Sequence, residues 1–381
     1  MYIYEHPDWP KFIWDEALIQ DLISSIRYKQ GFLSGRMSSI GFAMREESNL
    51  ETFTRDIIKS NEIEGEILHE AQVRSSVARR MGIYTAGLLP PNRKMDSMVQ
   101  MMLDATYAFD QELTKERLFE WHRLLFDGTK YNNIVVGAFR DDKYGAMQVV
   151  SGPIGKERVH CEAPKAHLLE AEMTKFLFWF NNSMQDNLLK AAIAHLWFVT
   201  LHPFDDGNGR ISRAISDMCL ARSENKKSRC YSMSGQIMLE RKDYYNKLES
   251  VQKHAMDITE WLEWFFGCLS RAIDSSSVML RKIIFKAEFW HKYAGLALNA
   301  RHLKMLGKML DNSGETTTSV WANICKCSQD TAGRDIGELI DIGILEAMGE
   351  GRGRYYTFKA LTPGSSLPSS HSKNAPPPVE M

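Results

Sequence analysis

A short segment in the middle of the chain combines the side chains that nucleotide chemistry needs. It is His202-Pro203-Phe204-Asp205-Asp206-Gly207-Asn208-Gly209-Arg210, and Arg213 follows closely. An imidazole titrates near neutral pH and can take a proton from a hydroxyl, and a carboxylate such as Asp206 can hold Mg²⁺ beside phosphate oxygens. Arg210 and Arg213 are spaced to share a helical face, so both can reach one triphosphate. Each residue type is common in ordinary loops, but their combination in this order indicates transfer of a group from a nucleoside triphosphate.

The elements on either side of this segment must position it. Residues 188–201 form an apolar run rich in Ala, Leu, Ile, Phe and Trp, and residues 211–222 return to helical spacing. The segment is therefore predicted to be the corner between two helices, with its glycines at the start of the second. Free backbone N–H groups and the positive dipole at such a helix start bind phosphate. His195, on the first helix, is expected to be a packing or hydrogen-bonding residue.

Length and composition are those of a soluble protein with two or three domains. The chain has 381 residues and a formal net charge of −1, whereas single cores rarely grow beyond about 250–300 residues. A charge near zero gives no general attraction to nucleic acid or to an anionic membrane. The chain shows neither a signal-peptide pattern nor an apolar run of about 18–20 residues, so we expect a cytoplasmic protein without membrane contact. The six cysteines are scattered, as is typical of reduced thiols.

The hydrophobic pattern predicts a mainly α protein. Gly, Pro and β-prone residues alternate over residues 131–164, where we expect a loop and a small hairpin at about residues 147–159. Near the C-terminus, two short helices and a glycine-rich hairpin outline a winged helix, and a Ser- and Pro-rich stretch that has little to bury follows. The expected organisation is an N-terminal helical region (1–95), a catalytic domain (96–270), a helical connector (271–298), a winged-helix-like domain (299–360) and a disordered tail (361–381).

The central segment matches, at every specified position, the signature His-Pro-Phe-x-Asp/Glu-Gly-Asn-Gly-Arg, and the chain therefore resembles the Fic family. The resemblance implies a helical core with a small hairpin flap. It also implies transfer of AMP from ATP to a Ser, Thr or Tyr hydroxyl of a target protein, the enzyme itself included, with release of pyrophosphate. His202 would be the general base and Asp206 the Mg²⁺ ligand. Residues 207–210 would form the anion hole, and Arg213 would contact the γ-phosphate.

Less specific positions complete the nucleotide site that the resemblance implies. The hairpin would register the target chain beside the site. The residues whose main chain would lie along the nucleotide are Ser151, Gly152, Pro153 and Ile154. Tyr244 and Gln252 match positions that line the adenine pocket in relatives. Tyr244 and Tyr245 are adjacent on an expected helix, however, and such a pair suits core and surface equally well.

A second signature, Ser60-x-x-x-Glu64-Gly65, resembles the family's inhibitory motif Ser/Thr-x-x-x-Glu-Gly/Asn. It implies that Glu64 pairs with Arg213 and removes the positive charge that the γ-phosphate needs. Ser60 and Glu64 are spaced to share a helical face, so the Ser60 hydroxyl is expected to steady the carboxylate. The neighbouring carboxylates are expected to be ordinary solvated residues, Glu62 and Glu66. In some relatives the matching glutamate instead positions a water that removes AMP from a modified target.

Two further alternatives stay open. Some Fic relatives transfer UMP, GMP or phosphocholine, and the tyrosine pair favours adenine only weakly. The helix expected over residues 328–340 would enter the DNA major groove if the chain were a regulator. Its charged residues do not form the basic face of a groove reader; they are Asp330, Arg334, Asp335 and Glu338. Protein interaction is therefore favoured for this domain over DNA binding, and a symmetric homodimer is the expected assembly on base rates.

Overall fold

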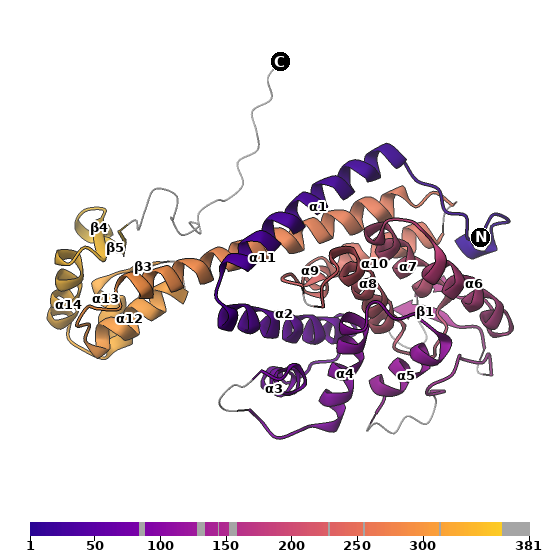
Figure 1. Ribbon diagram of the computed structural model, residues 1–381, viewed down its shortest axis with the longest axis horizontal. Coiled ribbons are helices and arrows are strands. Elements are labelled where there is room, and N and C mark those ends of the chain that lie inside the picture. Colours follow the sequence, from indigo (N-terminus) through magenta and orange to yellow (C-terminus); the bar gives the residue numbers. More distant parts are fainter. Residues whose placement is uncertain are drawn as a thin grey trace, which may run out of the picture. The chain divides into compact units, whose positions relative to one another are not determined.

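The structure is a computed structural model that describes residues 1–83, 88–127, 134–143, 145–151, 158–227, 229–253, 256–311 and 314–359. The described residues are mainly helical, with two small antiparallel sheets (Figure 1). The chain divides into two compact units, residues 1–276 and residues 277–381. The first unit contains the residues assigned from sequence to the N-terminal region and the catalytic domain. The expected tail, residues 361–381, lies outside the described residues.

Helices build most of the first unit, and one hairpin accompanies them. The hairpin strands are antiparallel, with Gln148 opposite Glu162. The elements are η1 (Ile3–Glu5), α1 (Glu16–Ser39), α2 (Phe42–Ile63), α3 (Glu70–Met81), α4 (Arg93–Tyr107), α5 (Lys115–Leu125), β1 (Gln148–Ser151), β2 (Arg158–Glu162), η2 (Ala166–Leu168), α6 (Leu169–Asn182), α7 (Asn187–Leu201), α8 (Asn208–Glu224), α9 (Met233–Leu239), α10 (Arg241–Gln252) and α11 (Thr259–Lys292), which continues into the second unit.

Helices α7 and α8 form the centre of the first unit. Residues 188–198 and residues 210–221 are all buried, which is typical of helices that present apolar side chains on every face. The Asp186 side chain caps α7 by accepting a hydrogen bond from the backbone of Leu188. The two helices predicted on either side of the central motif are therefore both present, and they pack against each other.

A buried ion-pair network connects α2 to α8. Arg229, which follows α8, lies 2.5 Å from the carboxylate of Asp217 on α8 and 3.8 Å from that of Asp56 on α2. Asp56 also accepts a hydrogen bond of 2.6 Å from the hydroxyl of Ser232. All three ionisable side chains are buried, and burial raises the pKa of Asp56. Because one guanidinium serves two carboxylates, the network determines where α2 lies along α8.

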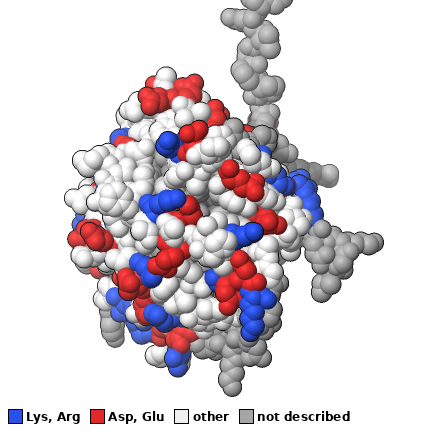
Figure 2. Space-filling model, turned by 90° about the vertical axis from the view of Figure 1, so that its right-hand side faces the viewer, with Lys and Arg blue, Asp and Glu red and all other residues white. Residues whose placement is uncertain are grey.

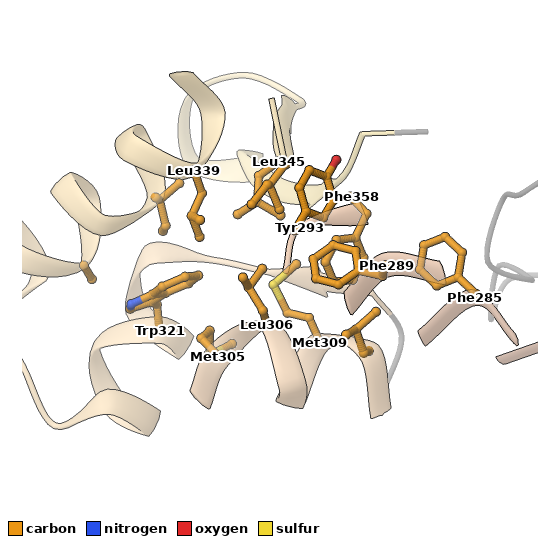
Figure 3. Close-up of a cluster of buried hydrophobic side chains, with 14 of the residues drawn as sticks. Phe285, Phe289, Tyr293, Met305, Leu306, Met309, Trp321, Leu339, Leu345 and Phe358 are labelled. Atoms are coloured by element: carbon orange, nitrogen blue, oxygen red, sulfur yellow. The ribbon is translucent and has the colours of Figure 1, made fainter. Parts of the chain in front are cut away.

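The described part of the second unit contains the end of α11, three further helices and a three-stranded sheet, and the last two helices precede a hairpin, as the sequence predicts. An apolar cluster that includes Phe289, Leu306, Trp321 and Leu339 fills its centre (Figure 3). The strand order is β3-β5-β4. The elements are α12 (Ala300–Asp311), β3 (Glu315–Thr316), α13 (Thr318–Cys325), α14 (Gln329–Asp341), β4 (Leu345–Met348), η3 (Gly351–Gly353) and β5 (Tyr355–Phe358).

The surface charges agree with a net charge near zero. Figure 2 shows acidic and basic side chains interspersed over one face of the protein. On α14, Asp335 is buried and pairs with Arg301 at 2.7 Å, so it does not belong to the helix surface. The exposed charges of α14 still include Asp330 and Glu338 beside Arg334. Among the described residues, no helix combines the length and the apolar character that a bilayer crossing requires.

The buried network predicts a large stability effect at Arg229. We expect Arg229→Met to lower the free energy of unfolding by about 3–5 kcal/mol, because it leaves two buried carboxylates without their cation. Urea titration followed by circular dichroism measures this loss. The matched control is Arg271→Met, since Arg271 pairs with Glu240 at 2.6 Å but is half exposed; its loss should stay below about 1 kcal/mol. Equal losses for the two variants would contradict the assignment.

Candidate active site

The loop between α7 and α8 adopts a backbone conformation that few residues tolerate. His202 ends α7 with φ 47° and ψ 56°, and Gly207 precedes α8 with φ 83°. A positive φ costs a non-glycine residue roughly 1–2 kcal/mol, so surrounding contacts must hold His202 in place. Glycine meets no such cost at the second position. The predicted helix corner is present, with the backbone of residues 208–210 at the start of α8.

Two side chains that the sequence analysis missed hold this loop. Arg140 is buried and donates a hydrogen bond from Nε to the carbonyl oxygen of His202 at 2.8 Å. The His122 ring stacks on Phe204 with centroids 4.2 Å apart, and its Nε2 lies 3.2 Å from the carbonyl oxygen of Asp206. Burial lowers the pKa of His122 to about 4, so this ring is neutral. Neither residue belongs to a motif, and no sequence signal marks them.

Asn208 also acts on the loop through its side chain. Its amide nitrogen donates to the carbonyl oxygen of Phe204 at 2.7 Å, and its amide oxygen accepts from the Phe204 N–H at 3.0 Å. The side chain of Asn208 is therefore committed to holding the loop closed. No described side chain caps the N-terminus of α8, so the backbone N–H groups there remain suited to an anion.

The geometry of His202 suits a general base. Its Nδ1 lies 3.3 Å from the carbonyl oxygen of Val199. This contact assigns the proton of the neutral ring to Nδ1 and leaves Nε2 as the basic nitrogen. Burial lowers the pKa of His202 to about 4, and the ring is therefore neutral and able to take a proton near pH 7.

Arg213 is buried and already engaged by the end of α2. Its NH1 lies 2.8 Å from Oε1 of Glu64, and its NH2 donates to the carbonyl oxygen of Ser60 at 2.7 Å. The Ser60 hydroxyl accepts a hydrogen bond of 2.9 Å from Nε of the same arginine. The Ser60 hydroxyl thus contacts the arginine with which Glu64 pairs, and its effect on the carboxylate stays a prediction. Glu64 is the C-cap of α2 and has left helical geometry, so the spacing of four residues no longer aligns the two side chains.

Glu64 also lies directly over the start of α8. A β-carbon built on Gly209 would collide with the Glu64 carboxylate. The carboxylate consequently occupies the space above the first turn of the helix, where a phosphate would meet backbone N–H groups. Only glycine at position 209 permits this approach, and the same absence of a side chain would admit a phosphate.

A second carboxylate, Glu66, pairs with the other arginine of the motif. Its Oε2 lies 3.1 Å from NH1 of Arg210, and its Oε1 pairs with Lys94. The expectation that Glu66 is an ordinary solvated residue was therefore wrong. Gly65 has φ 86° and reverses the chain after α2, which returns Glu66 to the site. Helical spacing cannot foresee this placement, because Glu66 lies beyond the end of the helix.

Asp206 offers the ligand that a magnesium ion would need. Its carboxylate is half exposed, lies 3.6 Å from NH2 of Arg210, and accepts a hydrogen bond of 2.5 Å from the N–H of Gly207. Mg²⁺ commonly uses one or two carboxylates with phosphate oxygens and waters. One solvent-facing carboxylate beside an anion-binding helix start therefore fits an ion that arrives with a nucleotide.

The remaining predicted residues lie around this centre or outside the described part. Tyr244 is buried, and its hydroxyl lies 2.8 Å from Nε2 of His195. Gln252 is buried and donates to the hydroxyl of Thr200 at 3.1 Å. His195 is thus a hydrogen-bonding core histidine, as expected. Both predicted adenine-pocket side chains are engaged by α7 in this conformation.

The flap is only partly described. Ser151 ends β1, whereas Gly152, Pro153 and Ile154 lie outside the described residues. The returning strand β2 is anchored on α10 by one carboxylate. Glu249 lies 2.8 Å from NH2 of Arg158 and 2.5 Å from Nδ1 of His160.

Comparisons with known proteins relate these regions to families. The model of the Fic/DOC family matches residues 112–220, which contain His122, Arg140 and the central motif. A domain of unknown function (DUF4172) matches residues 2–83, which contain Glu64 and Glu66. The two matches therefore divide the site between the central motif and the segment that supplies Glu64 and Glu66.

Similar proteins carry two different activity names. Protein adenylyltransferase Fic of Drosophila grimshawi is 26% identical over 229 residues, which are 59% of this chain and 43% of that protein. Uridine 5'-monophosphate transferase of Xanthomonas campestris pv. campestris is 33% identical over 119 residues, 29% of this chain and 21% of that protein. The chain thus spans less than half the length of either curated relative.

A solved structure shares the fold over nearly the whole chain. A Fic family protein from Desulfovibrio desulfuricans G20 has a TM-score of 0.53 and 20% identity, covering 93% of this chain and 99% of that one. The Fic/DOC match covers the central motif together with His122 and Arg140, and the helical fold is shared. The chain therefore contains a Fic/DOC family domain over residues 112–220.

Proposed function

We propose that the protein transfers AMP from ATP to a hydroxyl of a target protein, and that Glu64 keeps the site inhibited. The observation that carries this proposal is the position of the Glu64 carboxylate. It pairs with Arg213 and covers the start of α8, which is where the nucleotide phosphates would bind. Removal of this carboxylate would free both the charge and the space that a triphosphate needs.

The anion-binding groups support a triphosphate as the ligand. Nε of Arg210 is a buried donor without a hydrogen-bond partner among the described residues, and NH1 of Arg213 makes an ion pair but no well-directed hydrogen bond. Buried donors that lack acceptors are costly. Phosphate oxygens at these positions would satisfy both donors. Asp206 would hold Mg²⁺, which when bound neutralises phosphate charge and orients the pyrophosphate.

The chemical step follows from the position of His202. Its Nε2 takes the proton of the target hydroxyl as the hydroxyl oxygen attacks the α-phosphorus. A bond between that oxygen and phosphorus forms, the bond to the bridging oxygen of pyrophosphate breaks, and pyrophosphate leaves with the electron pair. Backbone N–H groups of residues 208–210 and the two arginines stabilise the charge that develops on the phosphate oxygens.

Two other activities stay as candidates for the same site. The relative from Xanthomonas is named for UMP transfer, and the buried Tyr244 gives no direct selection of adenine. Removal of AMP from a modified protein would use Glu64 to position a water. For the second unit we favour protein interaction or dimerisation over DNA binding, because the exposed charges of α14 include Asp330 and Glu338 beside Arg334.

Labelled nucleotides test the proposal. We expect Glu64→Gly to raise incorporation from α-labelled ATP by about 100-fold over wild type. Glu64 would displace the α-phosphate from the position for attack, and an error of about one ångström in that position can lower the rate by this factor. Label at the γ-phosphate should not enter protein, and Glu64→Gly/His202→Ala should be inactive. α-Labelled UTP in parallel identifies the donor. A Glu64→Gly variant that binds ATP without any gain would contradict inhibition by Glu64.

The pKa of His202 predicts an unusual pH profile. The value lies near 4, below the ordinary 6.5, so the ring stays deprotonated until the pH approaches 4. Glu64 raises this pKa, and its removal therefore shifts the value further down. We expect the transfer rate of Glu64→Gly at ATP concentrations well below saturation, which reports the free enzyme, to be level between pH 8 and pH 6 and to fall only on further acidification. A protonation step centred near pH 6.5 would show that the base is exposed or is another residue.

A further inference from the structure

The turn that ends α2 carries two carboxylates. The N–H of Glu66 donates to the carbonyl oxygen of Asn61 at 3.0 Å, and the N–H of Gly65 donates to that of Glu62 at 3.0 Å. With Gly65 in the left-handed region, this is the hydrogen-bond pattern of a Schellman cap. Glu64 precedes the reversal and Glu66 follows it. One compact turn therefore presents two acidic side chains to the start of α8.

Each carboxylate meets a different arginine of the motif. Glu64 pairs with Arg213 at 2.8 Å, and Glu66 pairs with Arg210 at 3.1 Å. Arg213 is 2% exposed and Arg210 is 6% exposed, so water offers either guanidinium little compensation. The charge of both arginines is consequently neutralised by the same segment. Loss of Glu64 alone would leave Arg210 paired.

We infer that Glu66 is a second inhibitory carboxylate, which competes with a nucleotide phosphate for Arg210. The inference rests on the proposed function, because it assigns a regulatory role at the same anion-binding site. The turn after α2 then inhibits the site through two acidic side chains, Glu64 and Glu66. Complete opening requires both of them to leave the arginines.

Lys94 on α4 gives Glu66 a second cation to pair with. It pairs with the other carboxylate oxygen of Glu66, so Glu66 keeps a cation when a phosphate displaces it from Arg210. The Glu66 side chain is 27% exposed, which also allows hydration after displacement. Lys94 should therefore weaken the ion pair between Glu66 and Arg210, and removal of the Lys94 charge should strengthen this ion pair.

Binding of MgATP tests the inference separately from catalysis. Titration calorimetry in a His202→Ala background prevents turnover while affinity is measured. We expect Glu66→Gln to bind MgATP about two- to fivefold more tightly, the range of one partly exposed ion pair. Glu64→Gly/Glu66→Gln should bind more tightly than Glu64→Gly. The matched control is Glu62→Gln: Glu62 pairs with Lys59 on α2 itself, and its loss should leave the affinity unchanged.

A second variant should change the affinity for MgATP in the opposite direction. Lys94→Met should weaken MgATP binding when Glu66 is present and have no effect in the Glu66→Gln background. Weaker binding by Glu66→Gln would show that Glu66 positions Arg210 for phosphate, and unchanged binding would show no competition; either result overturns the inference. Tighter binding without incorporation of α-label in any His202-containing variant would instead reject the proposed transfer activity and leave the competition intact.

Discussion

Two arginines with almost no solvent contact lie at the start of α8, and the rest of the site depends on the anions that they require. A buried guanidinium without a counter-charge costs several kcal/mol. Here Glu64 and Glu66 supply the negative charge to Arg213 and Arg210. A nucleoside triphosphate would supply the same charge at the same place. The proposed inhibition and the proposed binding of a nucleotide would thus be alternative ways of supplying counter-charge to the same two arginines.

The position of α2 determines where these two carboxylates lie. Asp56 on α2 shares Arg229 with Asp217 on α8, and all three side chains are buried. The two carboxylates that engage the site lie at the C-terminal end of α2, one on each side of the reversal at Gly65. A contact in the core and a contact at the site are therefore linked through one helix. Conditions that shift α2 would change access to the arginines.

The sequence allowed the helix corner and the pairing of Glu64 with Arg213 to be predicted. The corner follows from apolar periodicity on both sides of a glycine-containing turn, and the pairing follows from a family motif. Glu66 was assigned wrongly as a solvated helix residue because the chain leaves helical geometry at Glu64 and reverses at Gly65. His122 and Arg140 were missed, since they act on the loop through its backbone carbonyls and such contacts leave no pattern in the chain.

What the sequence by itself determined is local: the motif, the helices that flank it, and the glycines at positions 65, 207 and 209. These depend on conformational preferences and on neighbours within a few residues. The tertiary structure alone decided that Glu66 pairs with Arg210 and that His122 and Arg140 hold the loop. Such contacts join residues between 62 and 144 positions apart. They form only when α2, α4 and α5 pack around α8, which no local spacing specifies.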